Sequence, residues 1–120
     1  MMKTRADFLR AARDVRRVVP ALTLELTRTP EASADGKGLR YGVTASRKVG
    51  GAVERNRAKR RLREAARAVL PLSGLPGNDY VLVARRETLV ISFDVLLADL
   101  ARALDAAHAR QRQRASGDKP

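Results

Sequence analysis

Residues 52–70 constrain the fold of this chain more than any other segment. Two glycines precede the segment, and its apolar side chains recur at helical spacing: Ala58, Leu62, Ala65, Ala66 and Val69. This spacing predicts an amphipathic helix from about Ala52 to Leu70, which Pro71 is expected to end. The apolar face of such a helix has to be buried against another layer of secondary structure. The rest of the chain must therefore supply that layer.

Three segments are predicted to be strands. Residues Val18–Leu26 and Leu39–Ser46 alternate apolar and polar side chains, which is the pattern of half-buried strands. We expect these two to pair as an antiparallel hairpin, joined by a polar loop at Thr29–Gly38. The run Tyr80–Ala84 is short and continuously apolar, which predicts a strand buried on both faces.

Two further helices are predicted near the ends of the chain. A capping-box-like start at Thr4 and Asp7 indicates a helix over residues 5–14, with Val15 on its apolar face. A last helix is expected over Phe93–Ala109. Elements in this order indicate an α+β fold in which helices cover a sheet. We expect one domain over residues 1–112 and a disordered polar tail over residues 113–120.

The overall charge points to a polyanionic partner. The chain has 120 residues and a formal net charge of +12, which opposes compaction unless an anion neutralises it. Nucleic acid is the favoured partner, and a membrane surface or a simple excess of solubilising charge are the alternatives. The chain has no cysteine, which excludes disulfides and fits a reducing compartment such as the cytoplasm. No apolar run approaches the roughly 20 residues of a membrane span.

The positive charge is concentrated between residues 47 and 63, where Glu54 is the only acid. On the predicted helix, Arg55, Lys59 and Arg63 follow one another at i, i+4 and i+8, where like charges repel by a few tenths of a kcal/mol per pair. Arginine binds phosphate through a planar fork, and Asn56 can donate and accept hydrogen bonds at a 2′-hydroxyl or base edge. This pattern is typical of an RNA-binding helix, with a solvated basic face as the alternative.

Residues 40–64 resemble the signature of the bacterial ribonuclease P protein. The core of that signature is Arg-Asn-Arg at residues 55–57, followed by Lys-Arg at 59–60 and by Arg63. A Ser-Arg-Lys-Val-Gly turn at residues 46–50 precedes it. Asp7-Phe8 and the segment Tyr80–Arg85 also match the layout of the family, so the resemblance covers most of the chain.

The resemblance implies a fold, an activity and partners. It implies a two-layer α/β sandwich similar to ribosomal proteins, with a four-stranded sheet, about three helices and a split β-α-β unit. Its crossover would be left-handed, although roughly 98% of such units are right-handed. The implied activity is that of a subunit of ribonuclease P, which removes the 5′ leader of precursor tRNA. The implied partners are the catalytic RNA, which holds the Mg²⁺ ions, and precursor tRNA, but neither DNA nor a membrane.

The resemblance also assigns roles to individual residues. It implies that one set contacts the catalytic RNA: Arg47, Lys48, Arg55, Asn56, Arg57, Lys59, Arg60 and Arg63. It implies contact with the leader of precursor tRNA for Phe8, Leu22 and Arg85. Ala12 and Leu22 stand where relatives often carry aromatic residues, and Val15 where a glycine is usual. Because aromatic stacking on a base contributes roughly 1–3 kcal/mol, we expect a shallow preference among leader sequences.

The sequence suggests no catalytic or cofactor site of its own. His108 is the only histidine and is expected to be exposed or half-buried, while Asp94, Asp99 and Asp105 are expected at the helix start or on its solvent face. No grouping has metal-ligand spacing. Three alternatives stay open: a ribosomal RNA-binding protein, a nuclease that acts alone and a DNA architectural protein. They differ in the RNA that co-purifies, in activity without added RNA and in competition between duplex DNA and structured RNA.

Overall fold

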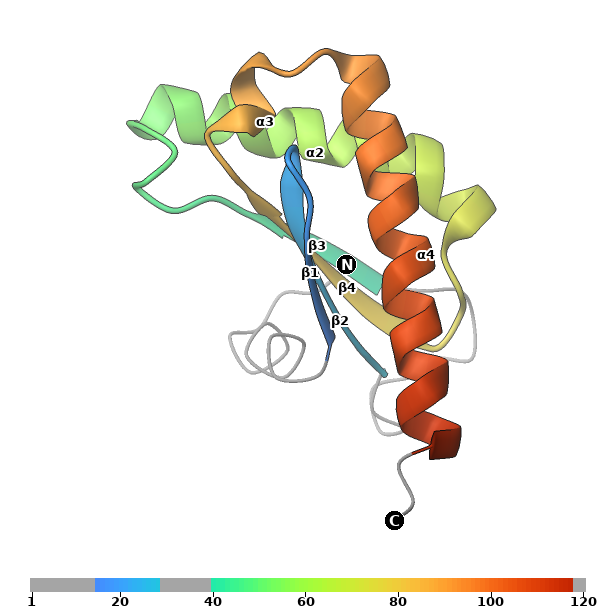
Figure 1. Ribbon diagram of the computed structural model, residues 1–120. Helices are drawn as coiled ribbons and strands as arrows, with labels where there is room; N and C mark the ends of the chain where they lie inside the picture. The colour runs from blue at the N-terminus through green and yellow to red at the C-terminus, as the bar shows by residue number, and fades with distance from the viewer. Residues whose placement is uncertain (1–14, 29–39, 118–120) are drawn as a thin grey trace.

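The computed structural model describes residues 15–28 and 40–117, and it contains a four-stranded sheet with both long helices on one face (Figure 1). The predicted helix at 5–14, the loop at 29–38 and Phe8 lie outside these residues. The elements in chain order are β1 (Val15–Val18), β2 (Leu22–Arg28), β3 (Arg40–Thr44), α2 (Ala52–Ser73), β4 (Asn78–Ala84), α3 (Glu87–Val90) and α4 (Phe93–Gly117).

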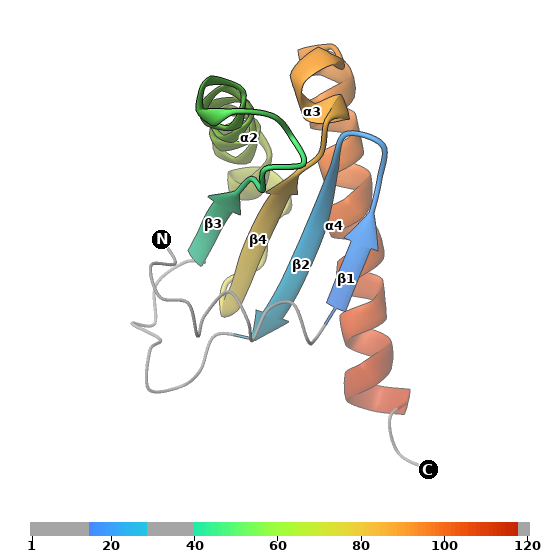
Figure 2. The same cartoon turned by 90° about the vertical axis from the view of Figure 1, so that its left-hand side faces the viewer.

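The strand order is β1-β2-β4-β3, which corrects the predicted hairpin (Figure 2). The predicted strand Val18–Leu26 contains the last residue of β1, a turn and most of β2. β1 and β2 pair antiparallel, and the Val19 N–H closes the turn between them by donating to the Leu22 carbonyl at 3.0 Å. Val15 begins β1 instead of extending a helix. β4 lies between β2 and β3, antiparallel to the first and parallel to the second. Alternation fixes which face a residue occupies, but it does not identify the neighbouring strand.

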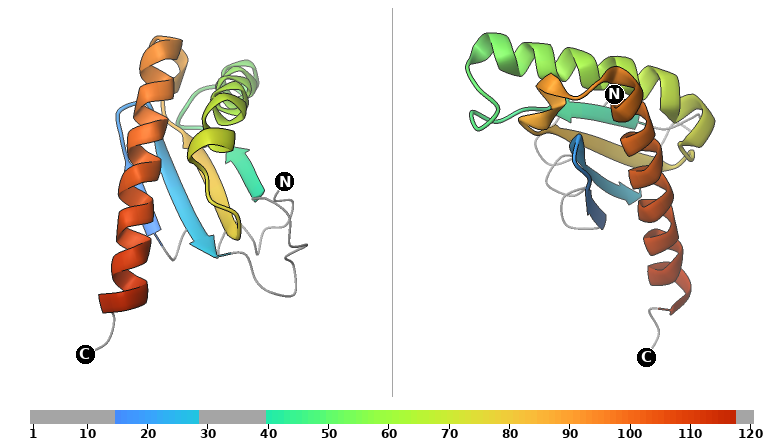
Figure 3. Two further views of the ribbon diagram at one scale, coloured as in Figure 1. Left: turned by 90° about the vertical axis from the view of Figure 1, so that its right-hand side faces the viewer. Right: turned by 45° about the horizontal axis from the view of Figure 1, so that its top comes forward.

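The connection from β3 through α2 to β4 is left-handed. In Figure 2 the helix lies behind the sheet and β4 lies to the right of β3, and the opposite view in Figure 3 agrees. The family resemblance implied this handedness, whereas the general rule for parallel units predicts the other. β3 and β4 are direct neighbours, so no strand separates the two strands of this unit, in contrast to the split arrangement that was expected.

The hydrophobic core lies between the sheet and the two long helices. α2 covers β3 and β4, and α4 covers β1 and β2 (Figure 3). The predicted apolar stripe of α2 is buried, and so are the helix-facing side chains of the two central strands: Leu22, Leu24, Leu26, Tyr80 and Leu82. Each fully buried leucine contributes roughly 1.5–3 kcal/mol of transfer free energy. β4 is buried on both faces, as predicted, although it begins at Asn78.

Both long helices extend beyond their predicted ends. Pro71 lies inside the last turn of α2, which ends where the Gly74 N–H donates to the Leu70 carbonyl at 2.8 Å. α4 continues to Gly117, so residues 113–117 are helical where a disordered tail was predicted. The short helix α3 was not predicted. Propensity and spacing leave element boundaries uncertain by a few residues, and tertiary contacts decide them.

Two polar side chains on α4 are buried, contrary to prediction. Asp99 is 2% exposed, and its carboxylate accepts a hydrogen bond from the Ala21 N–H at 3.1 Å and pairs with Arg102. His108 is 6% exposed, with its Nε2 2.7 Å from the Tyr80 hydroxyl. Burial lowers the pKa of His108, because the charged imidazolium is poorly solvated there. Asp99 therefore joins α4 to the turn between β1 and β2, and His108 joins it to β4.

Candidate nucleic-acid interface

The predicted RNA-contacting residues form one basic surface on the first half of α2 and the turn before it. We call this set, which comprises Arg47, Lys48, Arg55, Asn56, Arg57, Lys59, Arg60 and Arg63, the basic surface. Asn56, Arg57 and Arg60 are exposed, whereas Arg55 and Arg63 are half-buried along the helix. The helix can present these charges because its opposite side carries the buried stripe. The surface can therefore contact several phosphates at once.

The turn before α2 has a fixed geometry that depends on Gly50. Gly50 has φ of 149°, a region that favours glycine, and a Cβ there would lie 2.8 Å from the Glu54 Cβ. Val49 is buried, and the Arg55 guanidinium donates to the Gly50 carbonyl at 3.0 Å. The turn is therefore joined firmly to the helix. It holds Arg47 and Lys48 exposed at the edge of the basic surface.

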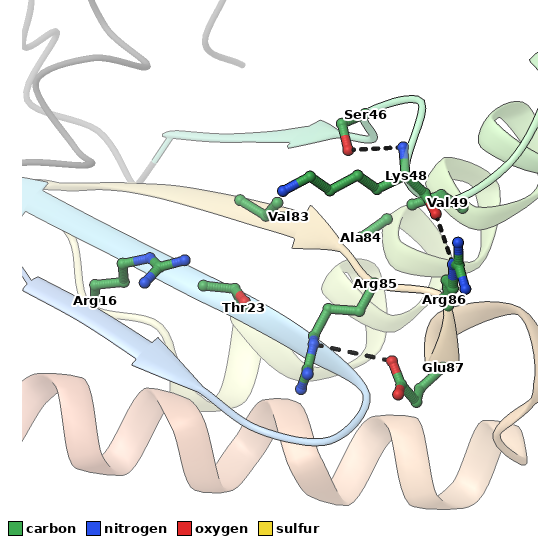
Figure 4. A pocket seen from close by; sticks show the side chains of 10 residues that line it. All are labelled: Arg16, Thr23, Ser46, Lys48, Val49, Val83, Ala84, Arg85, Arg86 and Glu87. Atoms are coloured by element: carbon green, nitrogen blue, oxygen red, sulfur yellow. Dashed lines mark hydrogen bonds and ion pairs between the residues drawn. The ribbon is translucent and has the colours of Figure 1, made fainter.

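A pocket of about 550 Å³ adjoins this turn (Figure 4). We call it the cleft pocket. Its strand residues Thr23 and Val83 alternate with core residues, so the pocket lies on the face of the sheet opposite α2 and α4. Its lining residues are Arg16, Thr23, Ser46, Lys48, Val49, Val83, Ala84, Arg85, Arg86 and Glu87. Lys48 thus belongs both to the cleft pocket and to the basic surface.

Cations predominate around the cleft pocket. Glu87 is the only acid among the lining residues that the structure describes, and four of those residues are basic. Glu25 lies beside the pocket, 3.5 Å from Arg16, and burial raises the pKa of this carboxyl against the opposing effect of Arg16. Among residues 15–28 and 40–117, no aromatic side chain lines the pocket. An anionic ligand held by charge fits these properties.

Arginine side chains also build the walls of the cleft pocket. Arg86 Nε donates to the Lys48 carbonyl at 2.9 Å, which joins the end of β4 to the turn before α2 (Figure 4). Arg85 donates to the Val19 carbonyl at 2.7 Å and lies 3.9 Å from Glu87. The predicted leader residue Arg85 therefore lines the pocket, with one nitrogen committed to the turn between β1 and β2.

The structure changes the remaining leader predictions. Leu22 has no exposed surface and packs in the core, so it does not belong to the candidate site. Its neighbour Thr23 faces the pocket instead, because side chains alternate along a strand. The sequence prediction missed Arg16, Thr23, Ser46 and Arg86. The alternation of β2 could have identified Thr23, but the other three depend on pairing between distant segments.

Arg61, in the middle of the basic run, has a different role. Its guanidinium donates to the Leu89 carbonyl at 3.0 Å and to the Ile91 carbonyl at 2.6 Å. These carbonyls belong to the end of α3 and to the connection that follows it. Arg61 therefore stabilises the fold by joining α2 to the end of α3.

Within residues 15–28 and 40–117, no group of three or more His, Cys, Asp or Glu side chains could hold a metal ion. In the same residues, no helix combines the length and the apolar character that crossing a membrane requires.

Comparisons with known proteins identify relatives of this chain. The ribonuclease P family model matches residues 1–108. The ribonuclease P protein component of Ruegeria pomeroyi is 50% identical over 110 residues, which cover 91% of this chain and 86% of that protein. Its counterpart in Paramagnetospirillum magneticum is 43% identical over 116 residues, covering 96% and 87%.

Solved structures share the fold. The RNase P protein of Staphylococcus aureus superposes with a TM-score of 0.69 at 24% identity, covering 88% of this chain and 93% of that one. The RNase P protein of Thermotoga maritima gives a TM-score of 0.70 at 22% identity, covering 88% and 94%. With a family model that spans most of its length and relatives of high identity, the chain belongs to the ribonuclease P protein family.

Proposed function

We propose that the chain is the protein subunit of ribonuclease P, the endoribonuclease of tRNA 5′ maturation, and that it binds RNA without cleaving it. Family membership supports the subunit role. The observation that carries the binding role is the basic surface, whose arginines accompany a single acid, Glu54, between residues 47 and 63. Phosphate contacts dominate the affinity of such surfaces for RNA.

The basic surface is proposed to hold the catalytic RNA. Structured RNA is recognised largely by its shape and its backbone, which an array of exposed guanidinium groups can follow. Arg57 and Arg60 are exposed and available for this contact, and Asn56 beside them adds a neutral group that can bind a 2′-hydroxyl. Arg47 and Lys48 extend the array from the turn.

The cleft pocket is proposed to hold the leader of precursor tRNA. Its basic side chains would bind leader phosphates, and Thr23 and Ser46 would offer hydroxyl groups. Because the described lining of the pocket is basic and holds no aromatic side chain, we expect leaders of different sequence to bind with similar affinity. Lys48 lies where the pocket meets the basic surface, so leader and catalytic RNA would meet at this residue.

The proposed mechanism is positioning by charge neutralisation. The catalytic RNA would provide the Mg²⁺ ions and the chemistry, and the protein would reduce repulsion between the two RNAs. The magnesium concentration needed for activity would then fall. Each phosphate neutralised by the protein adds roughly −0.7 to −0.9 to the slope of log affinity against log salt.

The deciding experiment measures cleavage of precursor tRNA by a bacterial ribonuclease P RNA at low magnesium, with and without this protein. We expect the protein to restore 5′ maturation and to have no activity alone. Cleavage by the protein without RNA would instead favour a nuclease that acts alone. Tight RNA binding without any stimulation would favour a ribosomal RNA-binding protein.

A second experiment isolates the cleft pocket. Arg16→Gln removes one lining charge and leaves the basic surface intact. We expect the reconstituted enzyme with this variant to bind precursor tRNA several-fold more weakly, and to bind mature tRNA, which has no leader, as the unmodified enzyme does. Equal weakening for both tRNAs would exclude the pocket as the leader site.

A further inference from the structure

A pocket of about 290 Å³ lies between the second half of α2 and β3, an edge strand of the four-stranded sheet (Figure 2). We call it the edge pocket. Among the residues that the structure describes, its lining consists of Tyr41, Ala66, Arg67, Leu70 and Pro71. None of these residues belongs to the basic surface or to the cleft pocket. Small-molecule pockets begin at roughly 300 Å³, so the edge pocket suits one ring-sized group.

The inner wall of the edge pocket is apolar and its position is fixed. Ala66 and Leu70 are buried side chains of α2, and Tyr41 is half-buried on β3. Beside Tyr41, the Arg40 guanidinium donates through Nε and Nη2 to the Asp79 carboxylate at 2.8 and 2.5 Å, which joins β3 to β4. The parallel pairing of β3 with β4 holds the same strand along its length. The aromatic ring of Tyr41 is therefore offered from a rigid element.

The rim of the edge pocket continues the basic surface. That surface includes a row of residues spaced four apart along α2: Arg55, Lys59 and Arg63. Arg67 and Pro71 are the next two positions of this row, at steps of about 6 Å along the helix axis. Both are exposed, and both line the pocket. The row therefore follows the side of α2 that faces β3, and it leads from the basic surface into the edge pocket.

A guanidinium beside an aromatic and apolar wall has the chemistry of a nucleotide site. The guanidinium of Arg67 suits a phosphate, which it can bind through two nitrogens. Proteins commonly bind unpaired bases of RNA by stacking them on aromatic rings, and Tyr41 supplies such a ring. A second copy of this chain fits less well, because its net charge of +12 would be repelled by the row that ends at Arg67.

We propose that the edge pocket binds one unpaired nucleotide of the catalytic RNA, with its base against Tyr41 and its phosphate on Arg67. The proposal rests on the proposed function, since the basic surface has to hold the same RNA. Phosphates along the row give affinity at any register. A base inserted in the pocket sets one register of the RNA along α2, which charge alone does not do.

Two single substitutions change the edge pocket in different ways. Tyr41→Leu removes the aromatic ring and keeps an apolar side chain, and Arg67→Gln removes the charge. Tyr41→Phe keeps the ring and is the matched control for the first. Arg110→Gln is the matched control for the second, because Arg110 is exposed on α4. Filter binding measures the affinity of each variant for ribonuclease P RNA over a range of salt concentrations.

The two substitutions should differ in their dependence on salt. We expect Tyr41→Leu to bind about tenfold more weakly with an unchanged salt slope, because stacking neutralises no phosphate. Arg67→Gln should also bind about tenfold more weakly, but with a salt slope smaller by roughly 0.7–0.9. Tyr41→Phe and Arg110→Gln should stay within about threefold of the unmodified protein, the effect of one screened charge.

Several outcomes would overturn the proposal. Tyr41→Leu binding as tightly as Tyr41→Phe would do so, and so would a loss that appears only with precursor tRNA. Altered sedimentation of free Tyr41→Leu at unchanged RNA affinity would assign the pocket to a second copy of the chain. The unmodified protein is measured first. If it fails to bind ribonuclease P RNA, the proposed function falls together with this pocket, whereas failure of the variants to differ from their controls refutes the pocket alone.

Chemical probing of the RNA gives a readout that a loss of stability does not imitate. Reagents that modify unpaired bases are applied to ribonuclease P RNA saturated with each variant. We expect one base to be protected by the unmodified protein and by Tyr41→Phe, and to become reactive with Tyr41→Leu. If Tyr41→Leu does not fold, Arg67→Gln replaces it, because an exposed side chain contributes little to stability. Identical protection by the pocket variants and their controls would refute the proposal.

Discussion

Arginine has opposite roles in two neighbouring regions of the molecule. On the basic surface, Arg57 and Arg60 extend from α2 and are exposed. Around the connection from β4 through α3 to α4, arginines instead bind the backbone of the protein itself. Arg61 of α2 donates to the carbonyls of Leu89 and Ile91, Arg85 to that of Val19, and Arg86 to that of Lys48. Arg60 and Arg61 are adjacent in sequence and differ in this respect. The number of arginines therefore overstates the surface available to RNA.

The difference has a physical cause in the short helix α3. The last carbonyls of a helix have no partner within it, and α3 is only four residues long. Arg61 on α2 donates hydrogen bonds to the carbonyls at this end, so these carbonyls depend on the arginine for their partners. Among the described residues, Arg57 and Arg60 donate to no such carbonyl. Both side chains are exposed, so their charge is available at the surface.

The largest expected effect is on RNA affinity. Replacing Arg57 and Arg60 together by Gln should weaken binding to ribonuclease P RNA by about 100-fold, because two charge-assisted contacts are lost. The free energy of unfolding should change by no more than about 0.5 kcal/mol, since both side chains are exposed. Filter binding and urea denaturation measure the two quantities. A large loss of stability would abolish the distinction between the two regions.

The second effect is on stability. Arg61→Met should lower the free energy of unfolding by about 2 kcal/mol, because two backbone carbonyls lose a charged donor. The affinity of the folded variant for RNA should change by less than about threefold, the effect of one screened charge. Arg60→Met is the matched control and should show the reverse. Urea denaturation of both variants tests whether stability depends on Arg61 and not on Arg60.

The third effect lies where the two regions meet. Arg86→Lys keeps the charge but loses the directed bond to the Lys48 carbonyl, which holds the turn before α2 against the end of β4. We expect about fivefold weaker binding of precursor tRNA, corresponding to roughly 1 kcal/mol for one hydrogen bond. Mature tRNA should bind unchanged. If both tRNAs bind the variant as tightly as the unmodified protein, the bond does not position the cleft pocket.

The smallest effect is a pH dependence of stability. The folded state lowers the pKa of His108 through burial, so near its ordinary pKa of 6.5 the unfolded chain binds more protons than the folded one. Stability is therefore complete above that pH and declines as the pH falls below it. Asp105 opposes the shift, and Arg112 reinforces it.

Urea denaturation at pH 7.5 and 5.5 measures this decline, and His108→Gln should reduce it. Arginine does not titrate in this range, so RNA affinity per folded molecule should not follow the same profile. A pH dependence of stability that is identical in His108→Gln and the unmodified protein would assign the effect to other groups.

The spacing of apolar and charged residues in the sequence predicted the structural features that depend on neighbouring residues in the chain. The buried stripe of α2, the burial of β4 and the position of the basic surface follow from spacing along the chain. The strand order does not, since β4 joins β2 and β3 only after a long connection. Likewise, nothing near Asp99 in the sequence indicates that it accepts a bond from Ala21.

For the candidate site, too, the sequence predicted the residues but not the long-range contacts that they make. Its charged residues could be identified because they are contiguous, but which arginines are exposed and which bind the protein's own backbone depends on carbonyls far away in the chain. Leu22 was assigned to the leader because the resemblance fixes a position, whereas the direction of its side chain follows from the register of β2 against β1 and β4.

The central position of β4 has a consequence for the order in which the protein can fold during synthesis. The hairpin of β1 and β2 and the strand β3 do not pair with each other, and both depend on residues 78–84. α2 leaves the ribosome before that strand, so its apolar face has no complete sheet to cover until β4 arrives. Sequence-distant pairing of this kind slows folding. The β1–β2 hairpin, β3 and α2 can therefore take up their final arrangement only after residues 78–84 have been synthesised.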